Sequence, residues 1–349
     1  MYSNFKYFKA SNGEEFYVIC DVYSQTELDE FLSTRPKHPV VDIGPTYYHK
    51  NWYDRFPIDY DIYRVPKWLA VDADQYLNET FSNTVETRAT FNFMLNKSNV
   101  HRYILLKLIE GMGFKTDYYT YSGVESFNTQ MYSLVNYIEQ LQHVPVEIAG
   151  HLVQPVNTEP KFHTDETSVV TKAFVTTSGD SSPAYNLSNY QKYLKPNFES
   201  TAVSLISESV VTEEQAGDWA IHFSEKTLFS VLGLTFPIWV GGYGQAEAWE
   251  SLGFDTFSDV INHRYQYMNT LVERCYYALY DNRHLLDDFD YAAKLRKMHR
   301  KRLLANREML LNNHMSHNVN EAVKQLPDGI DKYIRDMRTI WFSNFDSKQ

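Results

Sequence analysis

The residues with the clearest chemical potential stand at one predicted helix start, Ser224-Glu225-Lys226. Ser224 is a residue type that caps helix N-termini, and Glu225 complements the positive end of the helix dipole. Lys226 adds a cation beside backbone N–H groups that lack a partner within the helix, and this combination suits a phosphate. A carboxylate beside a bound phosphate can also pair with the hydroxyls of a ribose. The same residues equally fit plain helix capping with a solvated lysine.

Strands and helices alternate around this helix start. The expected elements are strands over 90–95, 202–207 and 236–240, and helices over 101–112 and 226–234. This alternation predicts a parallel α/β sheet with helices on both faces. Ligands in such sheets bind beyond the carboxyl ends of the strands. We therefore expect Arg102, Glu208 and the glycines at 241, 242 and 244 to converge there with the helix start.

The chain divides into three predicted parts. Residues 1–87 combine strand-like runs at 15–21 and 39–43 with an aromatic loop region, and predict an N-terminal α/β domain. Residues 88–275 carry the alternating elements, and 276–349 predict a helical C-terminal tail that packs back across both domains. Beyond Phe257 the pattern is almost entirely helical.

Several short segments of the second part together carry a family resemblance. They are Phe91-Asn-Phe-Met-Leu-Asn-Lys-Ser-Asn-Val-His-Arg102, Ser204-Leu-Ile-Ser-Glu-Ser209, Phe223-Ser-Glu-Lys-Thr227, Pro237-Ile-Trp-Val-Gly-Gly242 and Leu252-Gly-Phe-Asp-Thr-Phe257. In this order and at these separations they resemble the donor-binding half of GT-B glycosyltransferases, particularly the fucosyltransferase-like group and its relatives in large viruses and phages. The resemblance covers residues 88–275.

The resemblance implies an α/β fold of the GT-B type, in which two Rossmann-like domains face a cleft. It further implies that Arg102 and Lys226 bind a diphosphate, that Glu225 binds the ribose, and that Glu208 sits at a strand end facing the donor. Ser224 would open the donor-binding helix, and Gly242 would lie in the glycine-rich exit of the following strand. The loop before the His-Arg pair departs from the family, because it offers only Lys97 and Arg102 as cations.

The implied activity is metal-independent transfer of a sugar from a nucleoside diphosphate sugar to a hydroxyl of a glycan, a protein or a hydroxylated base of viral DNA. No other cofactor is expected. The base that activates the acceptor would be a carboxylate of the N-terminal domain, and Asp42 and Asp21 are candidates because each ends a strand-like run. Both also fit ordinary turn-capping or solvated aspartates.

Composition narrows the function classes. The 349 residues are 43% hydrophobic and 22% charged, which is typical of a globular protein. Only two cysteines are present, which excludes a disulfide framework or a cysteine-based zinc site. The N-terminus lacks a signal-peptide pattern, and no apolar run approaches the roughly 18 residues of a membrane span, so we expect a cytoplasmic protein (in the host cytoplasm if it is viral) without membrane contact.

Two short motifs suggest metal binding only weakly. Asp72-Ala-Asp74 spells the Asp-x-Asp pattern that can hold a cation, but it precedes a predicted helix that it could simply cap. The pairs His163/Asp165 and His314/His317 lack further ligands. We expect no metal site.

One basic cluster stands apart, on a predicted helix near the C-terminus. Its members are Lys294, Arg296, Lys297, Arg300, Lys301 and Arg302. It fits a solvated helix face, or a surface that contacts DNA phosphates without reading sequence. The net charge of −11 argues against a dedicated nucleic-acid coat. Two rivals to the transferase are a non-catalytic binding or structural (virion) protein with the same fold, and a phosphoryl transferase, which the absence of a phosphate-loop motif disfavours.

Overall fold

The protein is described by a computed structural model, and the positions it defines fall into separate stretches. They comprise short segments among the first 83 residues and then 86–95, 99–115, 118–121, 124–155, 195–208 and 220–311. The chain packs into two units. The first contains Met1–Glu79, Glu213–Ser224 and Glu308–Gln349, and the second contains Thr80–Thr212 and Glu225–Arg307.

The first unit contains a mixed four-stranded sheet. Its strands, in the spatial order β1-β2-β3-β5, are β1 (Phe5–Lys9), β2 (Glu15–Ile19), β3 (Val40–Asp42) and β5 (Ile62–Arg64). The β1–β2 pair is antiparallel, whereas β2–β3 and β3–β5 are parallel. A separate antiparallel pair joins β4 (Thr46–Tyr48) to β9 (Ala220–His222). The strands expected near 15–21 and 39–43 are thus present as β2 and β3.

The second unit is built on a four-stranded, wholly parallel sheet. Its spatial order is β10-β8-β6-β7, formed by β6 (Ala89–Leu95), β7 (Tyr118–Tyr121), β8 (Thr201–Ser207) and β10 (Phe236–Val240). Every residue of β8 and β10 is buried. Continuous apolar runs are typical of parallel strands covered on both faces. The three strands expected from such runs are confirmed.

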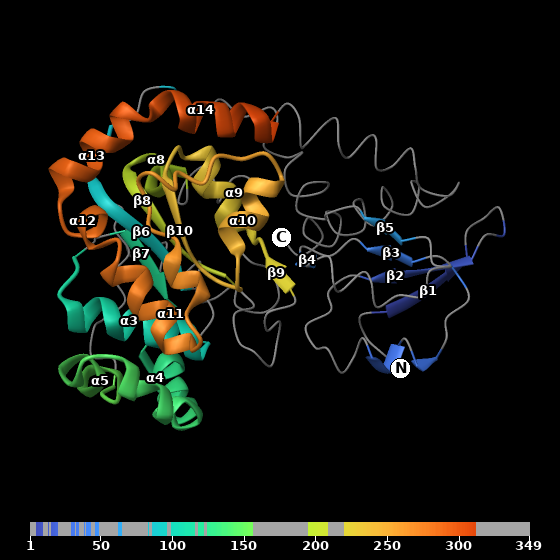
Figure 1. Ribbon diagram of the computed structural model, residues 1–349, viewed down its shortest axis with the longest axis horizontal. Coiled ribbons are helices and arrows are strands. Elements are labelled where there is room, and N and C mark those ends of the chain that lie inside the picture. The colour runs from blue at the N-terminus through green and yellow to red at the C-terminus, as the bar shows by residue number, and fades with distance from the viewer. Residues whose placement is uncertain are drawn as a thin grey trace, which may run out of the picture. The chain divides into compact units, whose positions relative to one another are not determined.

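Helices cover both faces of this sheet (Figure 1). On one face, Ile238 and Val240 of β10 belong to the apolar core that includes α3 (Val100–Met112) and α11 (Leu271–Tyr280). Trp239 alternates with them and points to the opposite face. There its indole Nε1 donates to Thr227 of α9 (Glu225–Leu232) at 2.9 Å. The mixed α/β class expected from the sequence is therefore confirmed.

The order of the strands reverses between β6 and β8. From β6 the chain crosses through α3 to β7 on one side, and it later returns to β8 on the other side of β6 before continuing to β10. In open parallel sheets this reversal opens a crevice beyond the carboxyl ends of the two strands, because the chain leaves them in opposite directions. The carboxyl ends of β6 and β8 are therefore the place where a ligand is expected.

The remaining helices flank this core. They are α4 (Val124–Ser133), the 3-10 helix η3 (Leu134–His143), α5 (Val146–Leu152), α8 (Lys195–Glu199), α10 (Gln245–Ser251), η6 (Arg264–Tyr267), α12 (Arg283–Leu286), α13 (Phe289–Met298) and α14 (Arg300–Glu308). The expectation of near-continuous helix beyond Phe257 is wrong between that residue and α11, where turns and η6 intervene. Among the described residues, no helix is both long enough and apolar enough to cross a membrane.

The helices from α11 onward belong to the second unit as far as Arg307. Leu279, Leu285 and Leu303 are buried in the same core cluster as β6 and β8, and the second unit extends to Arg307. The two units divide the chain after Glu79 and after Arg307, and the domain boundaries expected near residues 87 and 275 stay predictions. Apolar residues of α11 to α14 complete the core of the parallel sheet.

Candidate functional site

Buried polar side chains from the start of α3 and from the end of β8 lie at the carboxyl edge of the parallel sheet. His101 and Arg102 lie in the first turn of α3, which follows β6, and are 1% and 2% exposed. Glu208 directly follows β8 and is 0% exposed. The backbone N–H of Glu208 donates to the carbonyl of Val240 at 3.0 Å, which holds it against the end of β10.

The hydrogen bonds of His101 define its tautomer. Its Nε2 lies 2.9 Å from the carbonyl oxygen of Glu208. A carbonyl only accepts, so Nε2 carries the proton and Nδ1 is left with a lone pair. Nδ1 has no hydrogen-bond partner among the residues that the structure describes. The site therefore contains a buried acceptor with which no described residue pairs.

His101 is also held neutral. Burial, with a smaller contribution from the nearby charges of Arg102 and Lys226, lowers the pKa of His101 to about 3, against an opposing contribution from the Glu208 carbonyl. At physiological pH the imidazole is consequently an acceptor at Nδ1 and a donor at Nε2. Because both cations act on this one ring, the structure brings Arg102 and Lys226 into the same neighbourhood.

The start of α9 is fixed to the sheet by a chain of hydrogen bonds. Trp239 Nε1 donates to Thr227 Oγ1 at 2.9 Å, and Thr227 Oγ1 donates to Glu208 Oε1 at 2.7 Å. Lys226, one residue earlier on α9, is 6% exposed. Glu208 thus anchors the helix that carries Lys226, a role that the sequence interpretation did not assign to it.

Two cations therefore occupy the first turns of two helices at the edge where the strand order reverses. The N–H groups of such turns carry partial positive charge, and cations beside them strengthen the attraction for an anion. Arg102 contacts Ser207 through Nε to Oγ and through Nη2 to the backbone carbonyl, both at 3.4 Å. Both distances are long for hydrogen bonds.

The turn after β10 lies at the same edge and contains Gly242. A Cβ on Gly241 would come within 1.7 Å of Gln245 Oε1, so a side chain there would displace the buried glutamine. The backbone N–H of Ala246 donates to Gln266 Oε1 at 2.9 Å, so this amide at the start of α10 is already satisfied by the protein. Gly242 shapes this turn, and α10 is too short to supply an anion site of its own.

The sequence-predicted site residues are distributed as follows. Arg102, Glu208, Lys226 and Gly242 all lie at the carboxyl edge of the β10-β8-β6-β7 sheet, while Ser224 is buried, precedes α9 directly and falls in the first unit. Glu225 begins α9, but its side chain lies outside the described residues.

The two candidate bases are less well defined. Asp42 is the last residue of β3, where Ile19 and Arg64 are its strand partners, so its expected place at a strand end is confirmed. The Asp42 side chain and all of Asp21 lie outside the described residues. The same holds for the Asp72/Asp74, His163/Asp165 and His314/His317 motifs. Within the described stretches, no three His, Cys, Asp or Glu side chains are grouped to hold a metal.

Sequence reasoning missed the roles of His101, Thr227 and Trp239. The sequence places His101 next to Arg102. Only the tertiary contact to Glu208 shows that Nδ1 is the ring nitrogen without a hydrogen-bond partner among the described residues. Thr227 and Trp239 carry no signal of their own, because a buried threonine and tryptophan in an α/β core are ordinary.

The interpretation of Arg296 as a DNA-contacting cation is wrong. Arg296 is 0% exposed and burial lowers its pKa to about 9. Its guanidinium donates to the carbonyls of Gly233, Leu234 and Glu199 at 2.7, 2.9 and 2.9 Å. It also contacts Thr87 Oγ1 at 3.3 Å. Each acceptor lies two or three residues before a strand begins, so Arg296 connects the chain segments that lead into β10, β8 and β6.

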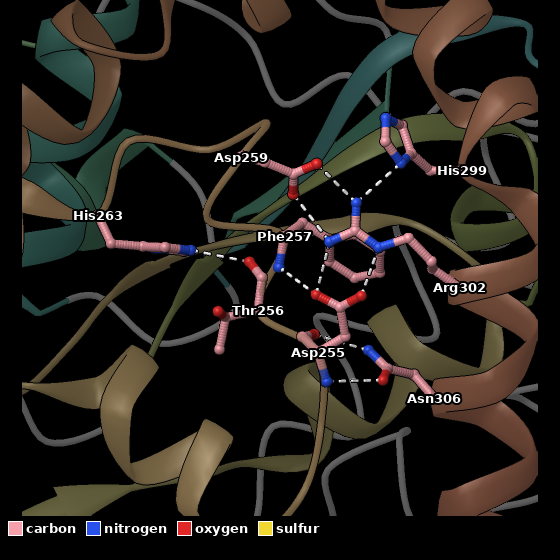
Figure 2. Close-up of polar contacts among 8 residues, drawn as sticks. All are labelled: Asp255, Thr256, Phe257, Asp259, His263, His299, Arg302 and Asn306. Atoms are coloured by element: carbon pink, nitrogen blue, oxygen red, sulfur yellow. Dashed lines mark hydrogen bonds and ion pairs between the residues drawn. The ribbon is translucent and has the colours of Figure 1, made fainter.

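Arg302 is likewise engaged within the protein (Figure 2). Its guanidinium bonds both oxygens of Asp255 at 2.5 and 2.9 Å and both oxygens of Asp259 at 2.7 and 2.8 Å, and it lies 5.0 Å from the centroid of the Phe257 ring. Arg302 holds the pKa of Asp259 below its usual value. Asn306 secures the same loop through both backbone groups of Asp255.

Within the basic cluster, Lys294, Lys297, Arg300 and Lys301 are exposed. Arg300 also donates from Nε to the carbonyl of Asn83 at 2.7 Å. DNA contact through the exposed members stays a prediction.

Comparisons of the chain with protein-family models, with curated proteins and with solved structures found no match. The resemblance to GT-B glycosyltransferases therefore stays a prediction, and a functional argument depends on the site itself.

Proposed function

We propose that this protein is a metal-independent glycosyltransferase that binds a nucleoside diphosphate sugar at the carboxyl edge of β6, β8 and β10 and transfers the sugar to a hydroxyl group. One observation carries the proposal. Two buried cations, Arg102 and Lys226, occupy the first turns of two helices beside a neutral histidine, at the edge where the strand order reverses. This arrangement suits a diphosphate linked to a group that bears hydroxyls.

The chemistry follows from where charge develops. When the glycosidic bond to the diphosphate breaks, negative charge grows on the leaving diphosphate, and preorganised cations and helix N-terminal amides stabilise it. Because the Arg102 and Lys226 side chains are buried, their attraction for that charge is screened less than it would be in water. Arg102 can engage two oxygens at once, whereas Lys226 acts as a point charge. These cations would supply the stabilisation that other enzymes take from a metal ion.

In this proposal the second unit is the donor-binding half of a GT-B arrangement with two Rossmann-like domains, and the first unit binds the acceptor. The support is the parallel sheet with its strand-order reversal, together with the sequence resemblance. The end of β3, where Asp42 lies, is the corresponding carboxyl edge of the parallel part of the first sheet. Asp42 is therefore our first candidate for the acceptor-activating base, with Asp21 the second.

A donor screen tests the proposal directly. We would incubate the full chain with nucleoside diphosphates and nucleotide sugars and follow thermal stability, together with release of the diphosphate when water replaces the acceptor. A ligand at 100 times its dissociation constant adds about 2.7 kcal/mol to the free energy of unfolding. We expect one base to stabilise the protein and its sugar conjugate to be cleaved. Binding without any cleavage or transfer would favour the non-catalytic alternative, and no binding at all would contradict the glycosyltransferase proposal.

Charge-removing variants locate the site. Lys226→Met and Arg102→Met keep most of the side-chain volume but remove one cation each, and Lys297→Met on exposed α13 is the matched control. We expect the first two variants to slow diphosphate release by roughly 100- to 1,000-fold, as for the loss of one oxyanion donor. The control should match the parent protein. Undiminished activity in both site variants would show that the donor binds elsewhere.

A further inference from the structure

At the carboxyl edge, one buried hydrogen-bond acceptor has no partner among the described residues. Nδ1 of His101 is a lone-pair acceptor in a side chain that is 1% exposed, and it has no partner among the described residues. Buried acceptors of native proteins are nearly always paired, so an exception calls for an explanation. The same ring donates from Nε2 to Glu208, which keeps the tautomer and the orientation of the lone pair constant.

The surroundings of the ring restrict what can bind there. Arg102 and Lys226 both lower the pKa of His101, so their positive charges lie close to it. A cationic donor such as an ammonium would be repelled by both, whereas an anionic ligand is attracted. A neutral donor carried by an anion suits Nδ1 and the two cations together, and a hydroxyl next to a phosphate meets both conditions.

We propose that His101 Nδ1 accepts a hydrogen bond from a ligand hydroxyl close to the diphosphate, which makes His101 a specificity-determining residue. Such a hydroxyl belongs either to the ribose or to the transferred sugar, and the shared chemistry is one O–H donated to a neutral imidazole. This inference rests on the proposed donor site. A site built to pair a hydroxyl discriminates strongly against an analogue that lacks it, because its own polar group is then left unpaired.

Two substitutions separate the two nitrogens of the ring. His101→Gln can place an amide N–H where Nε2 donates to Glu208 while removing the acceptor at Nδ1. His101→Asn can place an amide oxygen near the Nδ1 position while losing the bond to Glu208. The pair is matched, since each variant keeps one function of the imidazole and removes the other.

The experiment measures dissociation constants by calorimetry for the parent and both variants. The ligands are the nucleoside diphosphate that binds the parent, its 2′-deoxy and 3′-deoxy analogues, and the nucleotide sugar with and without its 2-hydroxyl. We expect the parent to bind one deoxy analogue roughly 5- to 150-fold more weakly, which corresponds to about 1–3 kcal/mol for an unpaired buried group. The nucleoside and sugar arms distinguish the two sources of the hydroxyl.

In the variants we expect His101→Gln to bind deoxy and parent ligands almost equally and His101→Asn to keep the discrimination. If the parent itself binds every deoxy analogue as tightly as its hydroxylated counterpart, the inference about His101 is overturned without reference to any variant. Discrimination that survives in His101→Gln overturns it as well. In both cases nucleotide binding persists, so the proposed donor site is not contradicted, whereas a parent protein that binds no nucleotide overturns both the inference and the proposed function.

Discussion

Buried arginines lie at both edges of the same parallel sheet, and they serve different purposes. At the amino edge, Arg296 donates to three backbone carbonyls at 2.7 to 2.9 Å and to the Thr87 hydroxyl at 3.3 Å, and so connects the segments that lead into β10, β8 and β6. At the carboxyl edge, Arg102 makes two 3.4 Å contacts to Ser207 beside a histidine that has an unused acceptor. At the amino edge the arginine is satisfied by backbone carbonyls, whereas at the carboxyl edge the Nδ1 acceptor of His101 has no partner among the described residues.

The difference follows from the direction of the strands. At the amino edge the chain arrives from helix ends and turns, which present carbonyl oxygens and so suit a guanidinium. At the carboxyl edge α3 and α9 begin, and their first turns present N–H groups that reinforce a cation instead of neutralising it. A buried cation is therefore structural where carbonyls converge and is a candidate anion receptor where helices start.

The largest expected effect is at the amino edge. Arg296→Met should reduce the free energy of unfolding by about 3–5 kcal/mol, because it leaves several buried carbonyls without a donor. Urea unfolding measures the change, with the exposed neighbour Lys297→Met as the control, for which we expect less than about 0.5 kcal/mol. A loss below about 1 kcal/mol in Arg296→Met would mean that the amino edge does not depend on this cation.

A second test concerns the turn whose carbonyl Arg296 binds. A Cβ on Gly233 would lie 2.5 Å from the Cβ and 2.8 Å from the backbone carbon of Phe198, so something must shift. We expect Gly233→Ala to lower the unfolding free energy by about 1–3 kcal/mol through overpacking. Gly150→Ala, in α5 with open space around its Cβ position, should be neutral or stabilising by up to about 1 kcal/mol. Equal behaviour of the two variants would contradict the close approach.

At the carboxyl edge, His101 should make stability depend on pH. Its pKa is near 6.5 when unfolded and about 3 when folded, so the unfolded state binds the extra proton and stability falls as pH drops below 6.5. Between pH 7.5 and 5.5 this amounts to about 1.4 kcal/mol. Unfolding curves at both values should show the loss in the parent and not in His101→Gln. An identical pH dependence in the variant would contradict a buried neutral histidine.

The smallest effect is expected at Arg302, whose side chain is 35% exposed. Arg302→Lys keeps the positive charge but loses the hydrogen bonds from the guanidinium to both oxygens of Asp255 and of Asp259. We expect this loss to lower the free energy of unfolding by about 0.5–1 kcal/mol. The pKa of Asp259, which Arg302 lowers, should rise toward its usual value, as carboxyl NMR titration would detect. An unshifted Asp259 pKa would show that the lysine replaces the guanidinium fully.

Much of the second unit could be predicted from local patterns. The buried strands over 90–95, 202–207 and 236–240 appear as expected, and so does the helix that Gly113 ends in a left-handed conformation with φ 76°. The rule that ligands bind beyond the carboxyl ends of parallel strands also predicts from the sequence that Arg102, Glu208 and Lys226 lie at the same edge of the sheet. Such predictions succeed because hydrophobic period and strand direction are local properties.

The part that could not be predicted depends on which groups meet across the fold. Lys294, Arg296 and Arg302 are similar cations on neighbouring turns, yet the first is exposed, the second is fully buried and the third is paired with two aspartates. The spacing of charges along a helix does not say which carbonyls or carboxylates from distant segments will face it.

The amino-acid sequence by itself determined an acidic α/β protein, a run of parallel strands, and cations placed at their carboxyl ends. Only the tertiary structure decided that Arg296 binds the segments that lead into the strands, that Glu208 anchors α9 through Thr227, and that His101 keeps one ring nitrogen without a partner among the described residues. Burial and hydrogen-bond pairing are properties of the packed chain, because they depend on residues that are far apart in the sequence, such as His101 and Glu208 at a separation of 107.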